Sequence, residues 1–289
     1  MEPNIRIEQA LTSALDEATD RSTPPGLAAA LRHAVFAGGA RVRPRLCLSV
    51  AMACGEDAPP LSDAAGVAIE FLHCASLVHD DLPCFDDAAL RRGQPSVHKA
   101  YGERLAVLAG DTLIVLAFGV LARHVPGAPQ RSGELLSLLA AAAGTPHGIA
   151  AGQAWECEER VPVSAYHRAK TGALFAAATV AGAIACGAPS APWRLLGERL
   201  GEAYQVADDL RDVIGEAEKL GKPVGQDQAH DRPSAVAALG VDGAKGRLDR
   251  LVSEAMHSVP ACPGREQLCA GILQEMHRVL PCKLSLVAA

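Results

Sequence analysis

The chain has 289 residues, of which 49% are hydrophobic, only 3% are aromatic and 21% are charged. A chain of this length could form one large domain or two small ones, and its formal net charge of −6 gives no indication of a nucleic-acid partner. The nine cysteines include no Cys-x-x-Cys pair and the N-terminus has no apolar signal segment, so we expect a cytoplasmic protein with reduced thiols.

Helical patterns follow one another along the chain. Residues 26–36 end at the helix-stopping pair Gly38-Gly39, and Ser62 is the expected N-cap of a long apolar helix that reaches Asp81. The apolar run over 105–122 is interrupted by Asp111 and does not predict a membrane span. The predicted helices cover residues 5–19, 26–36, 44–54, 62–81, 103–124, 132–143, 163–186, 193–214, 243–258 and 264–279, with a further helical piece up to about 158.

No stretch alternates between apolar and polar residues as a half-buried strand would. A polar segment follows the first long helix up to about residue 100, and residues 215–233 are predicted as a polar loop or lid. We therefore predict an all-α fold in which residues 1–289 form a single domain, a helical bundle around a central cavity.

Two acidic stretches end long apolar runs. One is His79-Asp80-Asp81-Leu82-Pro83-Cys84-Phe85-Asp86-Asp87, and the other is Asp208-Asp209-Leu210-Arg211-Asp212. Carboxylates this close repel one another unless a cation lies between them, and magnesium binds through a few carboxylates together with substrate phosphates. One such cluster could be a solvated helix end, but two clusters on apolar helices favour a metal–diphosphate site.

The helix periodicity adds further polar residues to each cluster. Gln205, Asp208 and Asp212 share one helix face at spacings i, i+3 and i+7, and so do Glu70, His73, Leu77 and Asp80. Basic residues lie nearby in sequence. They are Arg41 and Arg43 ahead of the first cluster, Arg91 and Arg92 after it, and Lys222 after the second.

These motifs resemble those of the trans-polyprenyl diphosphate synthases, especially the bacterial and plant geranylgeranyl branch. The matching segments are GGARVRP, EFLHCASLVHDDLPCFDDAALRRGQPSVHKAYG, LAGDTL, KTGALF and YQVADDLRDVIGEAEKLGKPVGQD, in family order from about residue 38 to 227. The resemblance implies the same all-α fold, normally as a homodimer. It also implies magnesium-dependent condensation of isopentenyl diphosphate with dimethylallyl, geranyl or farnesyl diphosphate, as in carotenoid and other isoprenoid biosynthesis.

The resemblance also implies roles for single residues. The metal ligands would be Asp80, Asp81, Asp86, Asp208, Asp209 and Asp212, holding three magnesium ions per active site. The allylic diphosphate would contact Arg91, Lys170, Thr171, Gln205 and Lys222, with Lys170, Thr171 and Gln205 acting nearest the bond that breaks. Isopentenyl diphosphate would contact Arg43, His73 and Arg92.

Two positions depart from the family pattern. Ala40 stands where the family usually has lysine, so one phosphate contact is missing or has moved to Arg41. Arg211 replaces the usual apolar residue and could pair with an acid or face solvent. We expect a structural role for His79, and a loose alignment offers Arg232 as a further basic residue.

Product length would depend on side chains about one turn and more before Asp80. Ala75 and Ser76 are small where farnesyl-forming relatives usually carry an aromatic ring, and Leu72 lies one turn deeper, so we predict geranylgeranyl diphosphate as the main product. Alternatively, Leu116 or Phe118 closes the cavity. The other functions to weigh are a farnesyl diphosphate synthase, a non-catalytic regulatory subunit of the same fold, and a terpene cyclase.

Overall fold

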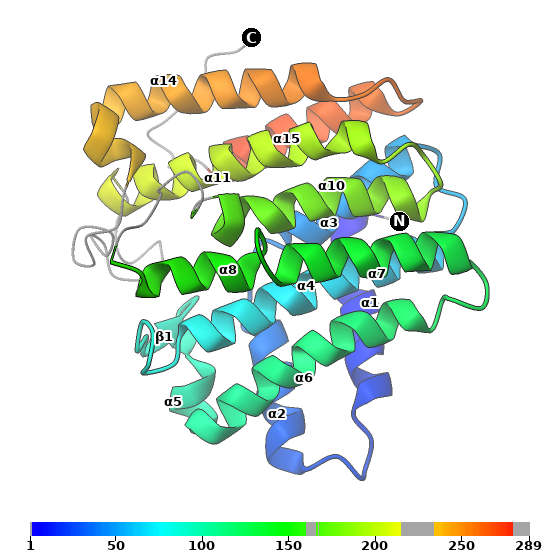
Figure 1. Cartoon of the computed structure of the whole chain (residues 1–289), viewed down its shortest axis with the longest axis vertical. Coiled ribbons are helices and arrows are strands. Elements are labelled where there is room, and N and C mark those ends of the chain that lie inside the picture. Colours follow the sequence, from blue (N-terminus) through cyan, green and yellow to red (C-terminus); the bar gives the residue numbers. More distant parts are fainter. Residues whose placement is uncertain (1, 160–165, 167, 215–233, 280–289) are drawn as a thin grey trace.

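The structure, a computed structural model, describes residues 2–159, 166, 168–214 and 234–279 (Figure 1). Its helices lie side by side in the all-α arrangement that the sequence predicts. The elements are α1 (Pro3–Ala18), α2 (Pro25–Phe36), α3 (Val42–Ala53), α4 (Pro59–Asp80), β1 (Leu90–Arg91), β2 (Gln94–Pro95), α5 (Val97–Tyr101), α6 (Glu103–Ala122), α7 (Pro129–Ala143), α8 (Ile149–Ala154), η1 (Trp155–Cys157), η2 (Arg168–Gly172), α10 (Ala173–Ala185), η3 (Ala191–Trp193), α11 (Arg194–Ile214), α14 (Ala235–Ser258) and α15 (Arg265–Val279).

Two sequence expectations are wrong in detail. The long helix α4 begins at Pro59 with Ala58 at its cap, because proline is well suited to a first helical turn, and Ser62 is buried inside the helix. The segment after the first acidic stretch contains a short antiparallel hairpin of β1 and β2, in which Arg91 pairs with Gln94. Its strands have two residues each, too short to produce an alternating pattern.

Helix α4 lies at the centre of the bundle. It contacts α1, α2, α3, α6, α7 and α10, and its residues are apolar or small on nearly every side, as expected of a helix buried all round. Both α4 and α6 are long and apolar enough to cross a membrane by length and composition alone. For α4, 78% of the apolar window is buried inside the protein, against 39% for α6.

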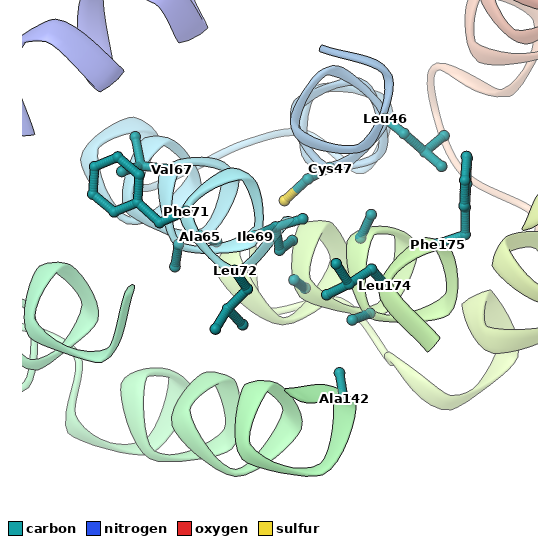
Figure 2. Close-up of a cluster of buried hydrophobic side chains, with 14 of the residues drawn as sticks. Leu46, Cys47, Ala65, Val67, Ile69, Phe71, Leu72, Ala142, Leu174 and Phe175 are labelled. Carbon is teal, nitrogen blue, oxygen red and sulfur yellow. The ribbon is translucent and has the colours of Figure 1, made fainter. Parts of the chain in front are cut away.

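The core joins α4 to α3, α7 and α10. Figure 2 shows Ile69 and Leu72 of α4 beside Leu174 of α10, with Cys47 of α3 above them, and Leu72 pointing towards the helix that carries Ala142. Each of these side chains is at most 7% exposed. Burial of a leucine or isoleucine side chain contributes about 1.5–3 kcal/mol, so this cluster fixes α4 in place.

A close approach of two helices in this core depends on Gly182. A Cβ placed on Gly182 of α10 would lie 2.3 Å from the carbonyl oxygen of Cys47 and 2.9 Å from Cβ of Val50, both on α3. Only a residue without a side chain lets the two backbones lie this close.

We expect Gly182→Ala to lower the free energy of unfolding by about 1–3 kcal/mol, because the added methyl group separates α3 from α10. Gly133 of α7 is the matched control, since no atom lies within 4 Å of a Cβ placed there. Gly133→Ala should raise stability by about 0.5–1 kcal/mol through helix propensity. Urea denaturation followed by circular dichroism measures both, and equal effects would contradict the packing assignment.

Candidate active site

The first acidic stretch folds back on itself where α4 ends. Asp81 caps the helix, and the chain turns so that the backbone amide of Asp86 donates to the carbonyl of Asp80 at 3.0 Å. Pro83 lies inside this turn, where it cannot continue the helix. The turn therefore brings the carboxylate of Asp86 next to that of Asp80.

A third carboxylate, from Glu156, completes this cluster. Single oxygen atoms of Asp80, Asp86 and Glu156 all lie within 4.8 Å of one another, and the three side chains are half-buried. Hard divalent cations prefer such oxygen donors, so this group fits a cation of the magnesium or calcium type. Sequence reasoning missed Glu156, because it lies alone in η1, far along the chain from either acidic stretch.

Lys170 connects this cluster to the neighbouring helix. Its Nζ lies 2.6 Å from Oε1 of Glu156 and 3.2 Å from Oδ1 of Asp80. The hydroxyl of Tyr166 also donates to Glu156, and the Gln153 amide donates to its other oxygen at 2.8 Å. Two carboxylates thus hold Lys170 in position. From its sequence position alone, Lys170 could have been an exposed lysine ahead of an apolar run, and the structure does not place it so.

The backbone that carries Lys170 is a π-helix, η2, and such single turns are frequent at functional sites. Gly152 of α8 allows η2 to approach, since a Cβ there would lie 2.5 Å from the backbone nitrogen of Lys170. Thr171, the next residue of η2, turns the other way and donates its hydroxyl to Oε1 of Gln205 at 3.0 Å. Consecutive residues of η2 therefore contact Asp80 of the first acidic stretch and Gln205, which itself donates to Asp209 of the second.

The second acidic stretch lies on α11. The Gln205 amide donates to Asp209 at 2.9 Å, and the other oxygen of Asp209 accepts from the backbone amide of Ala235 at 2.6 Å. Burial raises the pKa of Asp209, while these donors oppose that shift. Asp212 is buried, and Arg211 donates to Asp208 at 2.8 Å, so Arg211 pairs with an acid. Lys222 and Arg232 lie outside the described residues.

The hairpin of β1 and β2 sends two arginines in different directions. Arg91 donates to both oxygens of Asp81, with Nε at 3.0 and 3.2 Å. Burial raises the pKa of the Asp81 carboxyl, and the charge of Arg91 acts against this. Arg92 has a positive φ of 55° and instead reaches the carbonyl of Gly38 and the ring of His73.

Arg43, His73 and Arg92 form a separate basic group. His73 Nε2 lies 3.4 Å from Nη1 of Arg43 and 3.4 Å from Nη2 of Arg92. Burial, followed by the charges of these arginines, lowers the pKa of His73 well below its ordinary value, so its ring is neutral at neutral pH. Burial also lowers the pKa of Arg43, whose buried Nε has no hydrogen-bond partner in the described part of the chain. The three residues expected to bind the second diphosphate do converge.

Arg41 does not join this group. Its side chain is buried, and it donates to Glu8 at 2.7 Å, to Glu70 at 2.8 Å and to the carbonyl of Val35 at 2.7 Å. All three nitrogens of the guanidinium are therefore used in joining α1, α2 and α4. This placement argues against the expected phosphate contact and gives Arg41 a structural role.

The residues expected to set product length lie on α4 as predicted. Ala75 and Leu72 are almost fully buried, whereas Ser76 is half-buried and donates its hydroxyl to the carbonyl of His73 at 2.8 Å. His79 faces α6, where it contacts the Val107 carbonyl at 3.4 Å. A cavity of about 660 Å³ lies elsewhere, between α3, α11 and α15, and no predicted site residue in the described part of the chain lines it.

Comparisons with known proteins find relatives over most of the chain. The family described as polyprenyl synthetase matches residues 24–266. The chain is 55% identical over 280 residues to the geranylgeranyl diphosphate synthase of Cereibacter sphaeroides, covering 97% of each protein. It is 40% identical to the farnesyl diphosphate synthase of Geobacillus stearothermophilus, over 83% of this chain and 84% of the relative. A solved geranyltransferase from Helicobacter pylori, complexed with magnesium and isoprenyl diphosphate, has a TM-score of 0.82 and 29% identity, over 95% and 96% of the two chains.

We expect Glu156→Gln to weaken manganese or magnesium binding by about tenfold or more. Removal of a single group that supports a metal site typically lowers the metal affinity by at least about this factor. Isothermal titration of the protein with each ion measures the change. Glu134→Gln, on the exposed face of α7, is the control and should bind as the unmodified protein does. Equal metal affinities of the two variants would contradict the assignment of Glu156 to the metal site.

Proposed function

The chain belongs to the polyprenyl synthetase family, and we propose that it is a magnesium-dependent prenyltransferase with geranylgeranyl diphosphate as its main product. It would condense isopentenyl diphosphate with dimethylallyl, geranyl or farnesyl diphosphate. The observation that carries this proposal is that two groups of charged side chains with different compositions converge. One combines the carboxylates of Asp80, Asp86 and Glu156 with Lys170, and the other consists of Arg43, His73 and Arg92.

In the reaction, the allylic substrate loses diphosphate and the resulting carbocation is attacked by the double bond of isopentenyl diphosphate. Loss of a proton then completes the new unit. Magnesium ions, three per active site, would be held by Asp80, Asp86 and Glu156 and by Asp208 and Asp212, and they would neutralise the departing diphosphate. Asp81 and Asp209 support this site through Arg91 and Gln205.

The residues of the chain have separate tasks at the allylic diphosphate. Lys170, 3.2 Å from Asp80, would supply a fixed positive charge beside the leaving group, and Arg91 would supply a second. Lys222, which lies outside the described residues, is expected from the sequence to supply a third. Thr171 and Gln205 form a hydrogen-bonded pair between the two acidic stretches, where they position the allylic carbon. Fixed donors of this kind need no reorganisation as charge develops, and so they accelerate ionisation.

The basic group is suited to the diphosphate of isopentenyl diphosphate, which keeps its charge throughout. Two arginines can present planar pairs of donors, and neutral His73 holds them at 3.4 Å on either side. The buried Nε of Arg43 has no hydrogen-bond partner among the described residues, which fits a phosphate oxygen bound beside it. Ala40 cannot make the phosphate contact of the lysine that the family usually has at this position. Arg41 does not replace that lysine, because its guanidinium bonds to Glu8, Glu70 and the Val35 carbonyl.

We also propose that the enzyme is a cytoplasmic homodimer. Helix α6 presents Val107, Leu108 and Val115 with exposed fractions of 42%, 51% and 69%. An apolar face of this kind is suited to burial against the same face of a second copy. A dimer would cover part of the apolar surface of α6, whose apolar window is only 39% buried inside the protein.

The other functions are less well supported. A farnesyl diphosphate synthase is 40% identical, whereas two geranylgeranyl diphosphate synthases are 55% and 52% identical. A regulatory subunit would be expected to lack acidic residues, yet both stretches are complete. A terpene cyclase would have no use for a second anion site such as the group of Arg43, His73 and Arg92.

Product analysis tests the function. The protein is incubated with magnesium, isopentenyl diphosphate and each allylic primer, and the products are identified by mass spectrometry after dephosphorylation. We expect mainly geranylgeranyl diphosphate from all three primers, and loss of at least about 100-fold in rate for Asp80→Ala or Asp208→Ala. Absence of any elongated product, or a full rate in either variant, would contradict the proposal.

The same assay locates the end of the product cavity. Ala75→Tyr should shift the main product to farnesyl diphosphate, because a ring one turn before Asp80 shortens the space for the chain. Since Ala75 is only 1% exposed and a ring there could disturb packing, Ser76→Phe serves as a second variant at a half-buried position. If both variants are folded and still make geranylgeranyl diphosphate, the floor lies elsewhere, at Leu116 or Phe118.

A further inference from the structure

Two arginines, Arg43 and Arg211, have the same unsatisfied donor. The Nε of each is buried without a hydrogen-bond partner, and no other arginine nitrogen in the described part of the chain is in this position. Arg43 belongs to the basic group, whereas Arg211 lies on α11 in the second acidic stretch. A buried donor without a partner costs free energy, so both positions are suited to an acceptor that a ligand supplies.

Two packed aromatic rings connect these arginines. The guanidinium carbon of Arg43 lies 4.6 Å from the ring centroid of Phe175. That of Arg211 lies 5.7 Å from the ring centroid of Tyr204, and the two ring centroids are 5.2 Å apart. Both guanidinium groups are within the range of cation–π contacts, which hold a cation over an aromatic face. Arg211 therefore ends a continuous series of side-chain contacts that begins at the basic group.

The basic group alone carries less charge than a diphosphate. A terminal phosphate loses its second proton near neutral pH, so a prenyl diphosphate carries about three negative charges there. Burial and the neighbouring arginines lower the pKa of His73 and keep its ring neutral, which leaves one positive charge each on Arg43 and Arg92. Ala40 adds no charge, so a further cation would complete the balance.

The other arginines close to the basic group in sequence are used within the chain. Arg41, Arg45 and Arg91 each donate through at least two nitrogens to carboxylates or carbonyls. Among the described residues, Arg211 makes one such bond, from Nη2 to Oδ1 of Asp208 at 2.8 Å. A carboxylate has two oxygens, so Asp208 can accept from Arg211 and ligate a metal ion together.

We propose that Arg211 is a further binding residue for the diphosphate of isopentenyl diphosphate, supplying the positive charge that Ala40 lacks. This inference rests on the proposed function, which assigns that substrate to the basic group. The long side chain of Arg211 would extend over the Tyr204 ring towards the basic group, and its planar set of donors suits phosphate oxygens. Arg211 would thus join the second acidic stretch to the isopentenyl site.

Binding of isopentenyl diphosphate without an allylic primer tests the proposal, since no turnover occurs. Isothermal titration in magnesium buffer gives the dissociation constant. We expect Arg211→Leu to weaken binding by about tenfold or more, the scale of losing one hydrogen bond to a charged group. Arg199→Leu is the matched control and should bind as the unmodified protein does. Arg199 also lies on α11 and also pairs with a carboxylate three residues away, that of Glu202 at 3.2 Å.

A second substitution separates the charge of Arg211 from a structural role. Ala40 is exposed, so a lysine can be accommodated there. Adding Ala40→Lys to Arg211→Leu should restore a dissociation constant close to that of the unmodified protein. A double variant that binds as weakly as Arg211→Leu would overturn the proposal.

The competing role of Arg211 is support of Asp208 alone. In that case Arg211→Leu would weaken manganese binding and leave isopentenyl diphosphate binding unchanged, which would also overturn the proposal. Arg211→Gln, which keeps a polar side chain without the charge, should give the same result as Arg211→Leu, and circular dichroism shows whether each variant is folded. Product formation by the unmodified protein, together with unchanged isopentenyl diphosphate binding in both variants, would contradict this inference and leave the proposed function standing.

Discussion

The structure depends on keeping three carboxylates close together at the end of an apolar helix. Asp80, Asp86 and Glu156 would repel one another at the separations observed, and the ammonium of Lys170 lies against two of them. This ammonium reaches them from η2, which is the start of the apolar helix α10. The packing of α10 in the core therefore determines where η2 holds the Lys170 ammonium against these carboxylates.

The core in turn fixes how near these helices come. Gly152 lets α8 approach η2, and Gly182 lets α10 approach α3, so the acidic cluster and the basic group are held by a shared set of close helix contacts. Arg41 contributes as well, since its bonds to Glu8, Glu70 and the Val35 carbonyl join α1, α4 and α2. A buried charged pair is costly to break on one side only, which favours its structural role over substrate binding.

Much of the site could be predicted because its residues lie in short motifs with helical spacing. His73 and Asp80 share a face of α4, and Gln205 and Asp209 lie one turn apart on α11. What could not be predicted depends on contacts between distant segments. Glu156 joins the carboxylates only through the fold, the burial of Arg41 needs a partner from α1, and the hairpin that separates Arg91 from Arg92 has strands too short to leave a pattern.

The central claim is that the two acidic stretches hold metal ions and one diphosphate between them, apart from the basic group. A crystal structure with manganese and a non-cleavable allylic thiodiphosphate tests it most directly, since manganese is located by its anomalous signal. The account predicts manganese bound by Asp80 and Asp86 on one side and by Asp208 on the other, with Lys170 on the diphosphate. Manganese away from these residues, or a diphosphate bound only at Arg43, His73 and Arg92, would contradict it.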